Sequence, residues 1–527
     1  MAPGDVLFQE GDRGFSFFVV LEGTVEIVEE SRGAPHQVAL HHAGEFTGDV
    51  DTLSGRASLV TGRAVVDSEV LELTTAALRQ AVDALPEIGE IVLKAFLTRR
   101  TLLLSEGFEG IKIVGSRFSP DAHRLRDFAT RNAIPFTWID LESDEQAETL
   151  LRQFGVPPSA TPVVIGREGR YLANPTIAEL GRCAGLETPI DPSELHDLIV
   201  VGAGPAGLAA AVYAASEGLD VLVVERMATG GQAGTSSRIE NYLGFPMGIS
   251  GSDLMGNALL QAQKFGARIT VPGTVQRLGI DAGARIVTLA DGTKIRGKCI
   301  LVATGVEYRR PDVPRLSEFE GAGVYYAATD TETKLCINEE VVVVGAGNSA
   351  GQAIVALSRS ASRVHVVARA LDLGKSMSRY LVERVENLGN AQIHRGAVVT
   401  ALEGDGHLQT VHIRDEAGVE TRINTGAMFL FIGADPHTEW LDGCVQLDKK
   451  GFVVTGTSIP HDAVRGDLWR AQGRTPFFLE TSLPGVFAAG DVRSGSVKRC
   501  ASAVGEGAMA VSFVHASLDA GVPAVAT

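Results

Sequence analysis

The sequence contains few cysteines and no long apolar segment. Its 527 residues include five cysteines, at positions 183, 299, 336, 444 and 500, all widely separated. So few and so scattered cysteines argue against both a disulfide framework and a zinc site, and we expect no metal. No apolar run approaches the ~20 residues that a membrane-spanning helix needs. The sequence therefore predicts neither a small secreted scaffold nor an integral membrane protein.

Basic residues are also fewer than acidic ones, with 47 Lys and Arg against 64 Asp and Glu. The formal net charge is −17, which argues against nucleic acid or an anionic membrane as a partner. The N-terminal stretch MAPGDVLFQEGD lacks the charged-then-apolar pattern of a signal peptide. We therefore expect a cytoplasmic protein, long enough for roughly three to five domains.

The strongest positive signal is the segment HDLIVVGAGPAGLAAAVYAASEGLDVLVVER, which begins at residue 196. It predicts an apolar strand, a Gly-x-Gly-x-x-Gly turn, an Ala-rich helix and a second strand that ends in an acid. Gly202 would make the tight turn, Gly204 would let the backbone approach a pyrophosphate, and Gly207 would let the helix pack closely on the strand. Glu225 is placed to bind the ribose hydroxyls. The combination predicts a dinucleotide-binding fold.

A second copy of this pattern follows. Residues 341–344 predict a strand, Gly345 and Gly347 open a loop, and Ala350 takes the third small position. The next strand ends in Arg369, where the first copy has its acid. An arginine there suits the 2′-phosphate of NADPH better than the free hydroxyl of NADH. The alternative is that Arg369 is only a solvated residue at a strand end.

Two dinucleotide folds in one chain suggest a flavin opposite a nicotinamide. Segments 230–246 and 301–310 are compact, glycine-punctuated loops that suit a large cofactor. GVFAAGDV predicts a strand ending in Gly490 and Asp491, and Asp491 could bind the ribityl chain. The segment from Ala501 predicts a helix whose positive N-terminal end would stabilise a reduced flavin.

These motifs together resemble the thioredoxin reductase family in its low-molecular-weight bacterial form, over about residues 195 to 525. GGQ at 230–232, IENYLGFP, ATG at 303–305, GAGNSA at 345–350 and FIGADPHT at 431–438 carry the resemblance. It implies an FAD domain split by an inserted NADPH domain, a homodimer, and hydride transfer from NADPH to flavin. The predicted cofactor-binding residues are Gly202, Gly204, Pro205, Ala206, Gly207, Glu225, Gly231, Gln232, Asn241, Thr304, Gly305, Gly345, Gly347, Asn348, Ser349, Ala350, Arg369, Gly433, Gly490, Asp491, Arg499, Cys500 and Ala501.

The sequence departs from that family at the redox motif. Ala327 and Asp330 stand where the family has its two thiols, and Cys336 has no second cysteine nearby. Neither alanine nor a carboxylate can form a mixed disulfide, so we expect no disulfide reduction by the family route. Asp330 is the candidate catalytic residue, as a proton donor. The alternative is a polar residue that lines a loop.

A second redox motif is missing upstream. Residues 111 to about 185 predict a strand, a helix, a strand, a helix and a further strand, and resemble a glutaredoxin or thioredoxin. The four residues 119–122, Ser-Pro-Asp-Ala, occupy the place of the Cys-Pro-x-Cys of that family. Thr161-Pro162 resembles its cis-proline site. We interpret this unit as a spacer or docking module.

Residues 1 to about 100 resemble a cyclic-nucleotide-binding β-roll, with short alternating strands and turn glycines. GEFTGDVDTLSGRAS resembles the phosphate-binding cassette of that family. Arg56 would bind the cyclic phosphate, and Asp49 would replace the usual glutamate. The alternative is a degenerate β-roll kept for assembly. The candidate cyclic-nucleotide residues are Gly48, Asp49, Arg56, Ala57 and Ser58.

We therefore predict an α/β protein with two Rossmann-type domains behind a β-roll and a thioredoxin-like domain. The expected domains are the β-roll at 1–100, the thioredoxin-like domain at 101–190, the FAD domain at 195–312 and 429–527, and the NADPH domain at 313–428. The expected function is an FAD-dependent NADPH oxidoreductase that reduces an external acceptor, which could be a ferredoxin-like protein, a quinone, oxygen or a disulfide brought in by a partner. The alternative is a low-turnover sensor of redox state and cyclic nucleotide.

Overall fold

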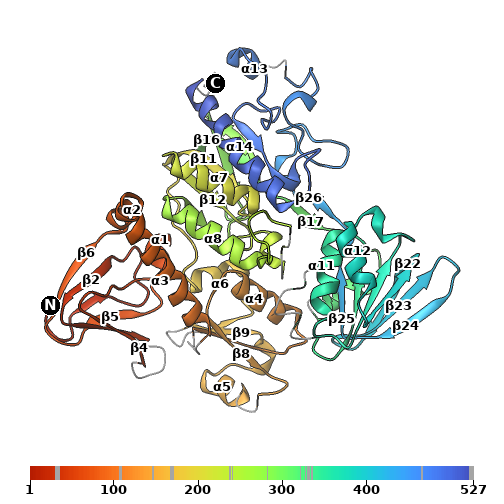
Figure 1. Ribbon diagram of the computed structural model, residues 1–527, viewed down its shortest axis with the longest axis horizontal. Helices are drawn as coiled ribbons and strands as arrows, with labels where there is room; N and C mark the ends of the chain where they lie inside the picture. The colour runs from red at the N-terminus through yellow and green to blue at the C-terminus, as the bar shows by residue number, and fades with distance from the viewer. Residues whose placement is uncertain are drawn as a thin grey trace.

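The structure is a computed structural model of the chain. It describes residues 1–29, 36–105, 110–144, 147–166, 171–236, 239, 241–281, 283–320, 322–326, 328, 333, 336–464 and 467–520. The fold is mixed α/β, with a β-rich N-terminal part and two larger units, each built on a parallel sheet (Figure 1).

The N-terminal part is a β-roll of two small sheets followed by helices. One sheet has the order β1-β5-β3-β4, and β2 pairs with β6 in the other. Gly23 turns between β2 and β3 with a φ of +89°, and a Cβ there would lie 2.2 Å from Ser68 Oγ, so only glycine fits. The elements are β1 (Val6–Phe8), β2 (Phe17–Glu22), β3 (Thr24–Glu29), β4 (His36–His42), α1 (Val50–Ser54), β5 (Thr61–Ala64), β6 (Glu69–Leu73), α2 (Thr75–Ala84) and α3 (Pro86–Ser105).

The next unit, which we call the middle unit, spans the described parts of residues 110–186. Its sheet has the order β10-β9-β7-β8, with β7 and β8 parallel and the other pairs antiparallel. Ser119 caps α4 by accepting a hydrogen bond from the Ala122 N–H. The Thr161-Pro162 bond is cis. Its elements are β7 (Ile111–Gly115), α4 (Pro120–Arg131), β8 (Phe136–Asp140), α5 (Ala147–Gln153), β9 (Val163–Ile165), β10 (Tyr171–Ala173) and α6 (Ile177–Cys183).

The larger of the two parallel-sheet units has seven strands. Its order is β13-β12-β11-β16-β15-β14, and β27 pairs with β16. The strands at its centre are parallel and largely apolar, because both faces of the sheet are buried. Its elements are β11 (Leu195–Val201), α7 (Pro205–Ser216), β12 (Val221–Val224), α8 (Gly251–Lys264), β13 (Arg268–Thr270), β14 (Val275–Asp281), β15 (Ala284–Leu289), β16 (Lys294–Val302), β27 (Val486–Ala488) and α14 (Cys500–Asp519).

The second parallel sheet has the order β18-β25-β19-β20-β21, and a three-stranded antiparallel sheet, β22-β23-β24, lies beside it. We call this the second dinucleotide unit. Its elements are α9 (Leu316–Phe319), β18 (Val324–Tyr325), β19 (Glu340–Val344), α11 (Asn348–Leu357), β20 (Arg363–Ala368), α12 (Arg379–Glu386), β21 (Ala391–Arg395), β22 (Ala397–Gly404), β23 (Leu408–Asp415), β24 (Glu420–Asn424) and β25 (Ala427–Leu430).

The chain leaves the seven-stranded sheet after β16 and returns to it at β27. The two crossing segments pair with each other, β17 (Val306–Tyr308) with β26 (Ala434–Pro436). Between β26 and β27 lies α13 (Asp467–Gln472), and β27 is parallel to β16. The first dinucleotide unit is therefore split, and the second is inserted into it.

Two of the predicted domain boundaries are wrong. The boundary between residues 100 and 101 falls inside α3, because TRRTLLLS contains no glycine or proline to end the helix. The boundary between residues 428 and 429 falls inside β25, which pairs with β19 along its whole length. None of the helices in the described part of the chain is both long and apolar enough to cross a membrane.

Candidate functional site

The first glycine turn connects β11 to α7. Gly202 has a φ of +106°, and a Cβ there would lie 2.4 Å from Ala303 O. A Cβ on Gly207 would lie 1.9 Å from Gly202 O. Packing of the protein itself therefore requires glycine at both positions.

Gly204 is different, because the protein's own packing does not require a glycine there. It is the N-cap of α7, with a φ of −75° that any residue can adopt. A Cβ there would meet only Gly231 Cα, at 3.8 Å. The backbone at the start of α7 thus stays open, with free N–H groups that suit an anion such as a pyrophosphate.

Glu225 follows β12 and ties this turn to the next loop. Its Oε2 accepts a hydrogen bond from the Ala203 N–H at 2.8 Å, and its Oε1 accepts one from the Met227 N–H at 2.8 Å. A carboxylate oxygen accepts more than one hydrogen bond. The ribose contact that we expect of Glu225 is compatible with these bonds and stays a prediction.

The loop after β12 returns to the first glycine turn. Gly231 has a φ of +54°, and a Cβ there would lie 2.9 Å from Gly204 Cα. Gln232 Nε2 donates to Val306 O at 2.7 Å, and Thr304 Oγ1 donates to His437 O at 3.0 Å. Segments distant in sequence therefore meet around the start of α7, as the predicted cofactor site requires.

Gly490 and Asp491 lie between β27 and α14. The Gly490 N–H donates to Glu506 Oε2 at 2.7 Å, and Glu506 also forms an ion pair with Arg493. Burial raises the pKa of Asp491, and its backbone carbonyl accepts a hydrogen bond from Lys498 Nζ at 2.9 Å.

Cys500 is the first residue of α14, and its thiol is not activated. Burial, reinforced by the charge of Asp491, raises the pKa of this thiol to about 11. It is therefore protonated at neutral pH and is a poor nucleophile.

Most of the remaining predicted residues of this site lie at exposed positions or in turns. Pro205 opens α7, and Gly305 and Gly433 have φ values of +64° and +102°. Three others are exposed, and they lie in a loop or at the start of α14: Asn241, Arg499 and Ala501. Ala206 is buried, because α14 packs on α7 so closely that a Cβ on Gly507 would lie 2.1 Å from Ala206 O.

The second glycine turn, between β19 and α11, resembles the first: packing requires its first glycine but not its second. Gly345 has a φ of +135°, and a Cβ there would lie 2.3 Å from Phe431 O. Gly347 caps α11 with a φ of −90°, and no atom would lie within 4 Å of a Cβ there. Asn348 Oδ1 accepts a hydrogen bond from the Ser378 N–H at 2.6 Å. An open helix start faces solvent here too.

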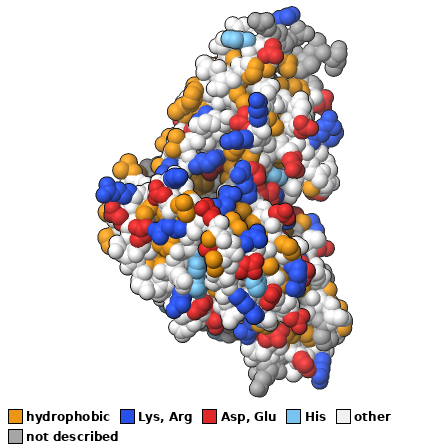
Figure 2. All heavy atoms as spheres, turned by 90° about the vertical axis from the view of Figure 1, so that its right-hand side faces the viewer, with side chains coloured by type: hydrophobic (Ala, Val, Ile, Leu, Met, Phe, Trp, Pro, Cys, Tyr) orange, Lys and Arg blue, Asp and Glu red, His pale blue; other side chains and the backbone are white. Residues whose placement is uncertain are grey.

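Arg369 lies at the same edge of this sheet. It follows β20, which runs parallel to β19, so its Cα is near the turn that opens α11. Arg369 and Ser349 are exposed, and Ala350 is buried beneath the turn. On this side of the molecule, acidic and basic side chains are interspersed, and basic ones gather near the middle of the face (Figure 2).

The predicted redox positions Ala327 and Asp330 lie outside the described residues. Cys336, downstream of them, is fully buried.

Two tyrosines that the sequence analysis missed meet near this segment. The rings of Tyr308, on β17, and Tyr326, after β18, are stacked with centroids 5.9 Å apart. The Tyr326 hydroxyl donates to Glu320 Oε1 at 2.6 Å, and burial together with this bond raises the pKa of Tyr326. No periodic pattern marks single aromatic residues in loops, so the sequence carried no signal for the pair.

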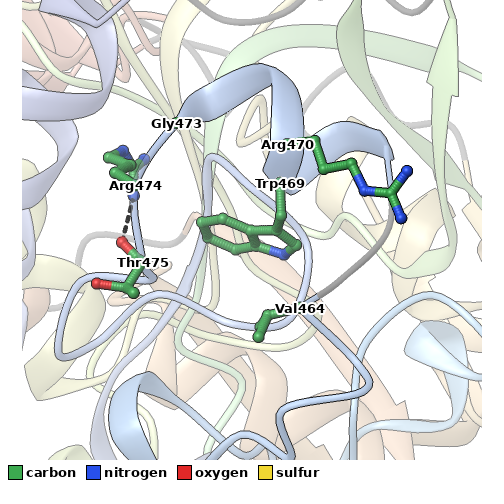
Figure 3. A pocket seen from close by; sticks show the side chains of 6 residues that line it. All are labelled: Val464, Trp469, Arg470, Gly473, Arg474 and Thr475. Atoms are coloured by element: carbon green, nitrogen blue, oxygen red, sulfur yellow. Dashed lines mark hydrogen bonds between the residues drawn. The ribbon is translucent and has the colours of Figure 1, made fainter.

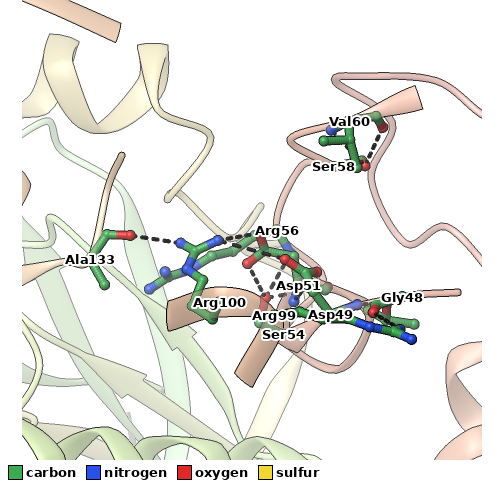
Figure 4. A network of polar contacts seen from close by, with 11 residues as sticks. Gly48, Asp49, Asp51, Ser54, Arg56, Ser58, Val60, Arg99, Arg100 and Ala133 are labelled. Atoms are coloured by element: carbon green, nitrogen blue, oxygen red, sulfur yellow. Dashed lines mark hydrogen bonds and ion pairs between the residues drawn. The ribbon is translucent and has the colours of Figure 1, made fainter. Parts of the chain in front are cut away.

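The cassette of the β-roll is a dense polar network (Figure 4). Asp49 caps α1 by accepting from the Asp51 N–H at 2.9 Å. Arg100 of α3 forms a buried ion pair with Asp51 at 3.0 Å and donates to Ala133 O at 2.8 Å. Burial lowers the pKa of Arg56, which lies beside both carboxylates. The Asp49 side chain is thus already engaged within the protein, and Arg56 lies close to the charges of the two carboxylates.

The other cassette residues support the loop. Gly48 has a φ of +95°, and its carbonyl accepts from Arg99 Nη1 at 2.7 Å. Ser58 Oγ donates to Val60 O at 2.7 Å. Ala57 packs against Gly185 of the middle unit, where a Cβ would lie 3.0 Å from Ala57 Cβ. Arg99 and Arg100 lie on α3, outside the segment that resembles the cassette, so neither was predicted.

An open pocket lies apart from these sites, around α13 (Figure 3). Its volume is about 420 Å³, and none of its lining residues was predicted to be functional. Arg474 forms an ion pair with the buried Glu480 at 2.6 Å. The lining residues are Val464, Trp469, Arg470, Gly473, Arg474 and Thr475. Within the described residues, no three His, Cys, Asp or Glu side chains group as metal ligands would.

Comparison with known proteins identifies two matching regions. Residues 196–507 match the family described as pyridine nucleotide-disulphide oxidoreductase, and residues 1–84 match the cyclic nucleotide-binding domain. A thioredoxin reductase of Mycolicibacterium smegmatis is 32% identical over 317 residues, which are 60% of this chain and 94% of that protein. A thioredoxin reductase of Treponema pallidum is 33% identical, over 62% of this chain and 97% of its own.

Solved structures of thioredoxin reductases also match this chain. The thioredoxin reductase of Lactococcus lactis, in its FR conformation, superposes with a TM-score of 0.54 at 26% identity, over 62% of this chain and 99% of its own. The thioredoxin reductase of T. acidophilum superposes with the same TM-score at 29% identity, again over 62% of this chain. The middle unit lies outside both matching regions.

Proposed function

Because the chain belongs to the pyridine nucleotide-disulphide oxidoreductase family and is related to thioredoxin reductases, we propose that it is an FAD-dependent oxidoreductase that oxidises NADPH. We propose further that its electrons pass to an external acceptor and not to an internal dithiol. The family's FAD and NADPH supply hydride chemistry when bound. We also infer a homodimer, as the resemblance implies, and a cytoplasmic location, as the composition suggests.

The observation that carries this proposal is the pair of open glycines. Gly204 and Gly347 are not demanded by packing, since a Cβ at either would meet no atom closer than 3.8 Å. In a dinucleotide fold this glycine keeps the space that the pyrophosphate occupies. The residues present therefore fit one dinucleotide at each helix start.

In this proposal, each unit has its own cofactor. The α7 start and Glu225 would hold FAD, with Asp491 toward the ribityl chain and the N-terminal end of α14 toward the flavin. The α11 start and Arg369 would hold NADPH, and the positive charge of Arg369 suits its 2′-phosphate.

The missing dithiol sets the electron count. The sequence contains no Cys-x-x-Cys, and Cys336, the cysteine nearest to the vacant motif, is fully buried. Such a chain stores one electron pair, on its flavin. Asp330 remains a proposed proton donor.

An anaerobic titration with NADPH, followed by flavin absorbance, tests the proposal. We expect complete bleaching at about one equivalent per flavin. Cys336→Ser should titrate identically. Bleaching that needs about two equivalents in the wild type and one in Cys336→Ser would reveal a hidden disulfide and overturn the one-pair proposal. A flavoprotein that neither NADPH nor NADH bleaches would overturn the enzymatic proposal itself.

The second candidate is a sensor with negligible turnover, and the match of residues 1–84 to the cyclic nucleotide-binding domain favours it. In this reading a cyclic nucleotide would compete with Arg100 for the cassette. Equilibrium binding of cAMP and cGMP separates the two. Micromolar binding that changes NADPH affinity, without turnover, would favour the sensor.

A further inference from the structure

The middle unit is firmly attached to the first dinucleotide unit. Buried Phe128 and Leu180 belong to one continuous core with Val271 of the larger unit. Asn132 Nδ2 donates to Met227 O at 3.0 Å. These contacts hold the middle unit beneath α8 (Figure 1).

Further polar and close contacts add to this attachment. Thr188 Oγ1, just after the middle unit, donates to Ile269 O at 2.7 Å. Arg131 Nη2 reaches the carbonyl of Gly231, at 3.4 Å, in the loop beside the first glycine turn. A Cβ on Gly181 would lie 2.5 Å from Pro272 Cδ, so the two backbones approach closely. The middle unit therefore moves with the first dinucleotide unit as one body.

At its other end the middle unit contacts the second dinucleotide unit through rings. Phe118 is stacked on His407, with centroids 4.2 Å apart and planes at 27°. The His123 ring lies 5.2 Å from that of Tyr325, which is buried at the end of β18. Phe118 and His123 flank Ser119, the residue that caps α4.

We propose that the start of α4 is a latch that holds the second dinucleotide unit in one orientation to the first. The latch consists of the pairs Phe118–His407 and His123–Tyr325. The chain crosses between the two dinucleotide units through β17 and β26, which pair as a two-stranded ribbon. Such a connection can serve as a hinge, because a few residues at the ends of elements suffice to absorb a change of orientation. The latch bridges the two dinucleotide units through the middle unit, which is itself fixed to the first of them.

The strength of the contact suits a latch. Each aromatic pair favours the latched arrangement, in which the two pairs are in contact, by roughly 2- to 12-fold over an arrangement without them. Two such pairs make an orientation dominant without making it permanent. Phe118 keeps 37% of its surface exposed, so its removal should not unfold the middle unit.

The latch uses the face that carries the vacant motif of the middle unit. Residues 119–122 begin α4, and Tyr325 immediately precedes the segment with the other vacant motif. A surface that would exchange electrons in the resembled families is therefore, in this chain, a structural contact. This inference concerns orientation alone and stands whether or not the chain turns over NADPH.

Single-molecule energy transfer in the full chain tests the latch. Dyes would be attached through non-natural residues at the exposed positions Gln276 and Ala417, one on each dinucleotide unit. The wild type should show one narrow distance population. The double variant Phe118→Ala with His123→Ala should show a second population, as the ratio of the latched to the unlatched arrangement falls by roughly 4- to 140-fold.

Tyr171→Ala is the matched control, since it removes an exposed ring from β10 of the same unit, and it should behave as the wild type. An unchanged single population in the double variant would overturn the latch, because the units would then be held by other contacts. Two populations in the wild type, with occupancies that the double variant does not alter, would overturn it as well.

Discussion

Arg100 Nη1 lies 3.0 Å from Asp51 Oδ2, and the two side chains are 11% and 2% exposed. The other terminal nitrogen of Arg100 donates to Ala133 O, in the middle unit. One guanidinium thus neutralises a buried carboxylate of the cassette and joins the β-roll to its neighbour.

Removal of this guanidinium should be costly. We expect Arg100→Met to lower the free energy of unfolding of the N-terminal part by about 3 to 5 kcal/mol, because the Asp51 carboxylate stays buried without its partner. Arg152→Met, which breaks the exposed pair with Glu148, should cost less than about 1 kcal/mol. Thermal unfolding of both variants measures the difference. Equal transition temperatures would contradict a structural role for the buried pair.

Asp49 should make stability depend on pH. Burial, and then the nearby charge of Asp51, raises the pKa of Asp49 to about 7 from its ordinary 3.8. The folded carboxyl therefore keeps its proton at pH values where the unfolded one has ionised. The stability from this group is fully present below about pH 4 and is lost as the pH rises toward 7.

Asp49→Asn isolates this effect, because asparagine still caps a helix but cannot ionise. Relative to the wild type, the variant should gain about 2 to 4 kcal/mol of unfolding free energy between pH 4 and pH 7.5. Unfolding curves at several pH values give the difference, from which groups common to both proteins cancel. A difference that does not vary with pH would mean that Asp49 has an ordinary pKa.

The glycine turns were predictable because their requirements are local. Gly202 and Gly207 meet atoms within the same strand–turn–helix unit or its neighbouring strand, so their spacing alone carries the information. The split of the first dinucleotide unit was predictable only through the family resemblance. No local pattern indicates that β27 pairs with β16.

Arg100, Phe118 and Asn132 were not predictable, since each acts through a partner far away in sequence. In a single sequence, Arg100 is one of two adjacent arginines outside the cassette segment, and Phe118 is one aromatic residue before a helix cap. Their roles follow from how three units pack, which propensity and periodicity do not encode. The domain boundary inside α3 was missed for a related reason, because that helix serves two units at once.

Gly204→Ala should separate cofactor binding from folding. The new methyl group would meet no protein atom closer than 3.8 Å. The free energy of unfolding of the apoprotein should therefore stay within about 1 kcal/mol of the wild-type value. It would, however, fill the space kept for the pyrophosphate, and we expect the purified protein to lose most of its flavin. The ratio of flavin to protein absorbance measures this loss.

The control for this experiment is Gly256→Ala in α8, where a Cβ would also meet nothing within 4 Å. It should keep its flavin and gain up to about 1 kcal/mol of stability, because alanine favours a helix more than glycine does. Full flavin content in Gly204→Ala would contradict the assignment of the α7 start to the dinucleotide phosphates.

Arg369→Ser should reduce the preference for NADPH. If the guanidinium binds the 2′-phosphate, its loss should raise the KM for NADPH by about 10-fold, which corresponds to ~1.4 kcal/mol. Because NADH has no 2′-phosphate, kcat/KM for NADH should stay the same. Arg363→Ser is the matched control, since Arg363 is an exposed residue at the opposite end of the same strand, β20, and it should change neither value. Equal losses with both nucleotides would assign Arg369 to the fold of the second dinucleotide unit instead of to nucleotide choice.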